Sequence, residues 1–85
     1  MQLRRVRGSS RVVHVWTSPA DDHEIGVPLE PDELFVVTGE TVVTVVGGVL
    51  GNGTKLKFAR ILSPRLGSRW LLSTSLSRDF TVVVK

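Results

Sequence analysis

The chain has 85 residues, eleven Lys and Arg against eight Asp and Glu, and a formal net charge of +3, which leaves room for one small domain. Because it has no cysteine, the sequence excludes a disulfide framework and a thiolate zinc site. No apolar run approaches the roughly 20 residues of a membrane helix or, near the N-terminus, the about 7–15 residues of a signal peptide, so we expect a cytoplasmic protein with no membrane partner.

The choice of residue types predicts strands. Valine occupies 15 positions, whereas alanine occurs only at Ala20 and Ala59. β-branched side chains lose rotamer freedom in a helix and pack well on a pleated sheet. No stretch longer than about two turns places apolar residues at helical spacing. The chain is therefore expected to be all-β.

The N-terminal segment is basic and rich in small residues. Its first seven positions contain three arginines, Arg4, Arg5 and Arg7. We expect residues 1–10 to form a basic arm or a frayed edge strand, and residues 11–85 to form the folded domain. The first clear strand is Arg11–Thr17, in which Val13 and Val15 share one face.

A long polar loop follows at residues 20–33. Residues 21–40 contain seven acids and no base, whereas residues 41–85 contain seven bases and one acid. The cluster Asp21-Asp22-His23-Glu24 brings carboxylates and an imidazole together, but no second His and no glycine-spaced calcium loop accompany it. A solvated acidic loop is the preferred interpretation, with a metal site as the alternative.

The central third of the chain predicts a hairpin. A strand is expected at Leu34–Thr38, closed by a turn at Gly39-Glu40. A valine-rich strand, Thr41–Leu50, follows and is interrupted at Gly47-Gly48. Gly51-Asn52-Gly53 predicts a tight turn, because Asn and Gly accept positive φ. The returning strand, Thr54–Leu62, is expected to point three side chains inward: Leu56, Phe58 and Leu62.

The C-terminal third completes the fold. A loop at residues 63–68 leads to a short strand at Arg69–Ser73, a 3₁₀ turn at Thr74–Ser77 and a last strand at Phe80–Val84. Short strands at this spacing favour a small barrel or two packed sheets. The sequence therefore predicts a small barrel of five to six antiparallel strands, with a long acidic loop and one 3₁₀ turn.

The strand Thr41–Leu50 is apolar on both faces, and such strands are normally covered on both. One of these faces carries an apolar ridge formed by Val42, Val46 and Leu50. A single small barrel covers only the inner face. Either the chain's own arm or loop covers the ridge, or a second copy does, and the sequence leaves both open.

Three stretches resemble a bacterial-type SH3 domain, a small β-barrel family. Val13–Pro19 resembles the opening strand that ends near Ser-Pro. Gly26–Val37 resembles the middle of the family, with Asp32 where Gly is usual. Ser68–Leu76 resembles the final strand and 3₁₀ turn, with Arg69 before the Trp. The resemblance spans about residues 12–84 and implies an SH3-like fold, although the hairpin Thr41–Leu62 exceeds the family norm.

The sequence favours a binding module over an enzyme. It contains no Gly-x-Ser-x-Gly elbow and no phosphate loop ending in Gly-Lys-Ser/Thr, so we expect no catalytic site and no cofactor. It has no tyrosine for an aromatic groove of the PxxP-binding kind. We expect a protein-binding or assembly module, such as a phage or mobile element encodes as an accessory subunit. The candidate interface residues are Trp16, Val42, Val46, Leu50 and Trp70.

Nucleic-acid binding is the alternative hypothesis. Small SH3-like and OB-like barrels bind nucleic acid through basic rims and stacked aromatics. The candidate polyanion-binding residues are Arg4, Arg5, Arg7, Arg11, Lys55, Lys57 and Arg69. The acidic block would repel phosphate wherever it faced the same side, so this hypothesis ranks below protein binding.

Overall fold

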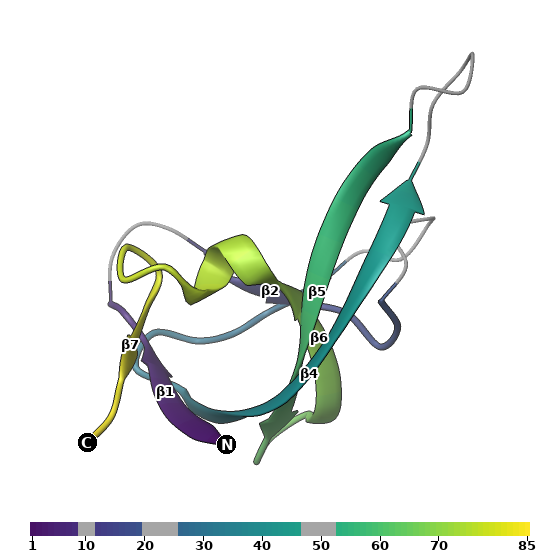
Figure 1. The fold of residues 1–85 in the computed structure, drawn as a ribbon. Helices are drawn as coiled ribbons and strands as arrows, with labels where there is room; N and C mark the ends of the chain where they lie inside the picture. The colour runs from purple at the N-terminus through teal and green to yellow at the C-terminus, as the bar shows by residue number, and fades with distance from the viewer. Residues whose placement is uncertain (9–11, 20–25, 47–52) are drawn as a thin grey trace.

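The computed structural model describes residues 1–8, 12–19, 26–46 and 53–85 (Figure 1). Its elements are β1 (Gln2–Val6), β2 (His14–Val15), β3 (Val27–Pro28), β4 (Leu34–Val46), β5 (Thr54–Ser63), β6 (Gly67–Leu72), the 3₁₀ helix η2 (Ser73–Leu76) and β7 (Thr81–Val83). Five strands form one antiparallel sheet in the order β6-β5-β4-β1-β7, and β2 pairs with β3. The predicted all-β class and the 3₁₀ turn are confirmed. The described residues contain no helix that is long and apolar enough to cross a membrane.

The N-terminal segment is a strand and not an arm. β1 pairs with β4 on one edge and with β7 on the other, so it lies inside the sheet. Arg4 and Val6 are buried on the core side, whereas Leu3 and Arg5 point outward. The expectation of an arm is therefore wrong for Gln2–Val6, because pairing on both edges satisfies the backbone of this segment.

The first predicted strand is shorter than expected. Of the predicted Arg11–Thr17, β2 covers only His14–Val15, and Trp16 adds an isolated bridge to Trp70 of β6. The partner strand β3 ends at Pro28, and just beyond it the Leu29 N–H still donates to the Val13 carbonyl oxygen at 2.8 Å. Within the strand, the predicted alternation holds and Val15 is fully buried.

β4 continues through the position where the sequence predicts a turn. Gly39 has φ +100°, and the pairing register shifts between Val37 and Thr41. The positive φ serves a β-bulge within one long strand, so the predicted turn at Gly39-Glu40 is wrong. Beyond the bulge, β4 and β5 project from the rest of the sheet as a two-stranded ribbon (Figure 1). We call this ribbon, residues 42–46 of β4 with residues 54–58 of β5, the arm; it is distinct from the N-terminal arm that the sequence predicts. The predicted glycine features at positions 47–52 lie outside the described residues.

The core is a cluster of buried apolar side chains from most strands: Val6, Val13, Val15, Leu29, Phe35, Ala59, Ile61 and Leu71. The core side of β5 is therefore the side of Ala59 and Ile61, and not that of Leu62, which is exposed. Phe58 is buried on the opposite side, where its ring packs edge-on against Trp16 with centroids 6.1 Å apart. Of the three side chains predicted to point inward, only Phe58 is fully buried, and Leu56 is half-buried.

Candidate functional site

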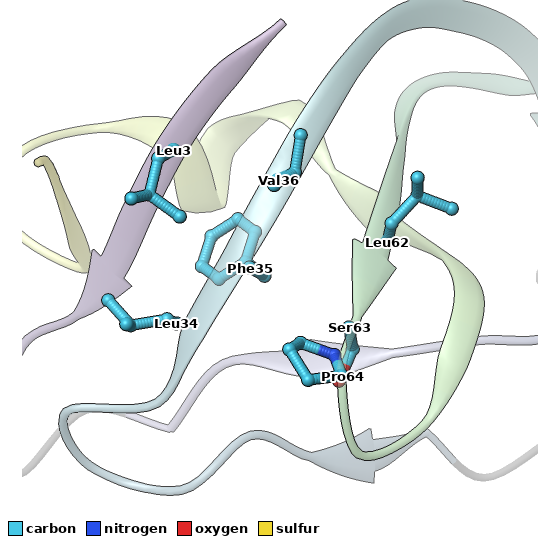
Figure 2. A pocket seen from close by; sticks show the side chains of 7 residues that line it. All are labelled: Leu3, Leu34, Phe35, Val36, Leu62, Ser63 and Pro64. Carbon is cyan, nitrogen blue, oxygen red and sulfur yellow. The ribbon is translucent and has the colours of Figure 1, made fainter.

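The outer face of the sheet carries an apolar hollow, which we call the strand-face site. Leu3 of β1 pairs with Val36 of β4, and Val36 pairs with Leu62 of β5, so the three side chains form one row. Leu34 and Pro64 flank this row (Figure 2). The hollow has a volume of about 360 Å³, and its walls are almost entirely apolar.

Three leucine side chains of the strand-face site are exposed to solvent. Leu3 is 39% exposed, Leu34 is 44% and Leu62 is 40%. Strand alternation sends Phe35, which lies between the outward Leu34 and Val36, into the core. An antiparallel sheet normally presents polar side chains on its solvent face. A cluster of exposed leucines on such a face makes it the candidate functional site of the described residues.

One edge of the strand-face site is held by an ion pair. Arg65 Nη2 lies 3.0 Å from Glu33 Oε1, and Arg65 Nε donates to Glu33 Oε2 at 3.2 Å. Partial burial raises the pKa of Glu33, but the hydrogen bonds from Arg65, from the backbone N–H of Glu30 and from the Ser63 hydroxyl outweigh it, so the pKa is lowered overall. The carboxylate therefore stays ionised and fixes the loop beside Pro64.

Arg4 is a structural residue and not a polyanion contact, which corrects the prediction. Its side chain is buried, with 7% of the residue exposed. Nε donates to Thr81 Oγ1 (2.9 Å), Nη1 to Gln2 Oε1 (2.7 Å), and Nη2 to the carbonyl oxygens of Leu76 (2.6 Å) and Thr81 (3.2 Å). Burial lowers the pKa of Arg4. The bonds to Leu76 and Thr81 tie β1 to the end of η2 and to the start of β7.

The remaining candidate cations do not gather on one surface. Arg5 and Arg7 lie on the outer face beside β1, whereas Lys55 and Lys57 lie on the opposite face of the sheet, on the projecting arm. Arg69 pairs with Ile61 and is half-buried, and its Nε atom is buried with no hydrogen-bond partner among the described residues. Arg11 lies outside the described residues.

The predicted aromatic interface is largely part of the fold. Trp16 and Trp70 exchange two backbone hydrogen bonds of 2.7 Å, and both side chains are half-buried. A Cβ placed on Gly26 would come within 3.0 Å of the Trp16 ring, so the backbone of Gly26 lies directly against that ring. Trp16 therefore packs between Gly26 and Phe58.

The predicted valine ridge is only partly described. Val42 pairs with Phe58 and is 37% exposed, while the side chain of Val46 and all of Leu50 lie outside the described residues. On the same face, the Thr44 hydroxyl donates to the Pro19 carbonyl oxygen, so Pro19 lies against this side of the arm. The more exposed valines of the arm are on its other face: Val43 (59%) and Val45 (61%).

Among the described residues, no group of three or more His, Cys, Asp and Glu side chains is placed to hold a metal ion. The cluster Asp21-Asp22-His23-Glu24 lies outside them. Sequence reasoning missed the strand-face site because Leu3 fell in the expected arm and Leu62 was assigned inward. The alternation of side chains along β5 could have identified it: Ala59 and Ile61 lie on one face of the strand, and Leu62 lies on the other.

Comparison of the chain with protein-family models, with curated proteins and with solved structures gave no match. The function is therefore argued from the geometry of the described residues.

Proposed function

We propose that the chain is a small, non-enzymatic protein-binding module and that its binding site is the strand-face site. The observation that carries the proposal is the exposure of Leu3, Leu34 and Leu62, each by about two fifths, around an apolar hollow. Full burial of such a side chain is worth roughly 1.5–3 kcal/mol, so completing the burial of all three offers about 2–4 kcal/mol. A partner that covers the site gains this free energy.

The chemistry of the hollow favours a protein side chain over a small polar ligand. Small-molecule sites combine apolar walls with a few placed polar groups that orient the ligand. Here the lining residues are Leu3, Leu34, Phe35, Val36, Leu62, Ser63 and Pro64. Only Ser63 has a polar side chain, and its hydroxyl is engaged with Glu33 and with the N–H of Leu66. A bulky apolar side chain from a partner protein matches these walls.

The setting we propose is an SH3-like module in a cytoplasmic accessory or assembly subunit. The strand order β6-β5-β4-β1-β7 and the 3₁₀ turn between β6 and β7 support the SH3-like interpretation. Such folds host many functions, so the strand-face site and not the fold carries the functional argument. We do not propose nucleic-acid binding, because Arg4 is buried and hydrogen-bonded within the fold. Lys55 and Lys57 also lie on the opposite face of the sheet from Arg5.

The test is selection of peptides from a displayed random library on the wild-type protein, followed by affinity measurements on Leu62→Gln. We expect the selected peptides to share a bulky apolar residue. Loss of one central apolar contact of about 1–2 kcal/mol predicts roughly 5- to 30-fold weaker binding to the variant. The matched control is Val45→Gln, which changes an even more exposed apolar residue on the arm (61% against 40% for Leu62) and should leave the affinity unchanged.

Two results would contradict the proposal. One is that no peptide is enriched on the wild-type protein when peptides that also bind Leu62→Gln are removed by counter-selection. The other is that selected peptides bind wild type and Leu62→Gln with equal affinity but lose binding to Val45→Gln. Both positions are exposed and neither belongs to the core, so we expect both variants to fold. Near-ultraviolet circular dichroism is the check that they do.

A further inference from the structure

We propose that Arg5 is a specificity-determining residue of the strand-face site and that the partner is an extended segment with a carboxylate two residues from its apolar anchor. This inference rests on the proposed function and names the chemistry of the partner. It follows from the position of one exposed cation relative to the hollow, and from the engagement of the neighbouring cations elsewhere.

The outer face of β1 changes from apolar to basic along its length. Leu3 and Arg5 are both exposed and are separated by one residue, so their side chains lie on the same face about 7 Å apart along the strand. Arg5 pairs directly with Leu34, which places its Cβ about 5 Å from that of a leucine lining the hollow. The guanidinium therefore stands at the rim of the apolar site.

The other arginines around the site already have partners. Arg60 is paired with Glu40 at 3.1 Å, and Arg65 is paired with Glu33 at 3.0 Å. Arg5 makes no ion pair with the described residues, and it is exposed. Among the described residues around the site, Arg5 is thus a cation that a partner's carboxylate can reach without breaking an existing pair.

Arg7, the next cation along the same face, is less suited to this role. Its Nη1 donates to the carbonyl oxygen of Arg78 at 2.8 Å. A Cβ on the neighbouring Gly8 would lie 3.9 Å from both carboxylate oxygens of Asp32, so an acid already stands near that end of β1. The preference for a carboxylate is therefore expected to centre on Arg5.

The spacing of the partner's residues follows from strand geometry. In an extended segment, side chains two residues apart point to the same side and are separated by about 7 Å, which matches the separation of Leu3 and Arg5. With its apolar residue in the hollow, such a segment places the side chain two positions away at Arg5. Depending on the direction of the segment, the carboxylate precedes or follows the anchor.

A second copy of the chain is a poorer occupant on the same grounds. In a symmetric dimer through the strand-face site, each copy would present its exposed Arg5 to the other. These like charges would oppose the apolar contact, whereas an acidic segment complements it. The partner that fits the strand-face site is therefore an acidic, apolar-anchored protein segment.

The experiment titrates the full chain with synthetic peptides of Ser and Gly that contain one leucine and, two residues from it on each side, Glu, Gln or Lys. At low ionic strength, we expect the Glu peptide to bind wild type about two- to fivefold more tightly than the Gln peptide. The Arg5→Glu variant should reverse this order and prefer the Lys peptide. Lys57→Glu, on the opposite face, is the matched control and should keep the wild-type order.

The outcomes separate the inference from the function on which it rests. If all three peptides bind wild type equally and Arg5→Glu changes nothing, while Leu62→Gln abolishes binding, the role of Arg5 is refuted and the binding site stands. If no leucine peptide binds more tightly than its leucine-to-serine counterpart, both fall. If sedimentation shows a wild-type dimer that Leu62→Gln dissociates, a second copy occupies the site and the acidic partner is refuted.

Discussion

Replacing Arg4 by Met removes the guanidinium that ties β1 to the C-terminal segment while keeping most of the side-chain volume. Three of its four hydrogen bonds end on Leu76 and Thr81, whose acceptors would be left without this donor. A hydrogen bond from a charged donor contributes about 1.5–3 kcal/mol, and removing the buried charge offsets part of the loss. We therefore expect Arg4→Met to lower the free energy of unfolding by about 2–4 kcal/mol, out of roughly 4–13 kcal/mol for a domain of this size.

The assay is urea unfolding followed by the fluorescence of Trp16 and Trp70, with Arg5→Met as the matched control. Arg5 is the next residue on the same strand and is exposed, so its replacement should change the free energy of unfolding by less than about 0.5 kcal/mol. The denaturant slope should not change, because the same surface is exposed on unfolding. Equal stability of the Arg4 and Arg5 variants would refute the reasoning, since it would mean that both arginines are solvated.

Three further predictions concern single positions. Glu33 has a lowered pKa in the folded protein, so its contribution to stability is present above its unfolded pKa of about 4.3 and is lost as pH falls through the folded value. Glu33→Gln should therefore reduce the loss of unfolding free energy between neutral and acidic pH, and an unchanged pH dependence would contradict this. Gly39→Val should destabilise the fold by about 1–2 kcal/mol because of the +100° φ, measured by urea unfolding, and a neutral effect would contradict the bulge. Gly26→Ala places a Cβ 2.9 Å from that of His14 and should shift the near-ultraviolet circular dichroism of Trp16, whereas an unchanged spectrum would mean that Gly26 does not lie against the Trp16 ring.

Much of the architecture could be predicted because it is encoded locally. β-branched residues and turn signals located β5, β6, η2 and β7 close to their observed positions. The alternation also correctly placed Val13 and Val15 on one face, and that face is buried in the core. In these segments, the propensity of the residues and their burial agree, so no distant contact is needed to decide the structure.

The parts that could not be predicted depend on contacts far apart in the chain. Two arginines among the five residues of β1 made this segment look like a solvent-exposed arm. The carbonyl oxygens of Leu76 and Thr81, which accept hydrogen bonds from the buried Arg4, lie more than 70 residues away in sequence. Gly39 adopts the positive φ that either a turn or a bulge requires, and only the register with β5 distinguishes them.

The strand-face site was missed for a related reason. Its row of three side chains, Leu3, Val36 and Leu62, comes from three strands, and it exists only once their registers are fixed. A shift of one residue in any of these strands would turn that strand's apolar side chain to the other face.

The most direct test of the strand-face site is methyl NMR of the leucines and valines during titration with a selected peptide. The largest shifts are expected at the methyl groups of Leu3, Leu34 and Leu62, while those of the buried Leu71 change little. Shifts concentrated instead at the valines of the arm, Val42, Val43 and Val45, with the three leucines unaffected, would contradict it.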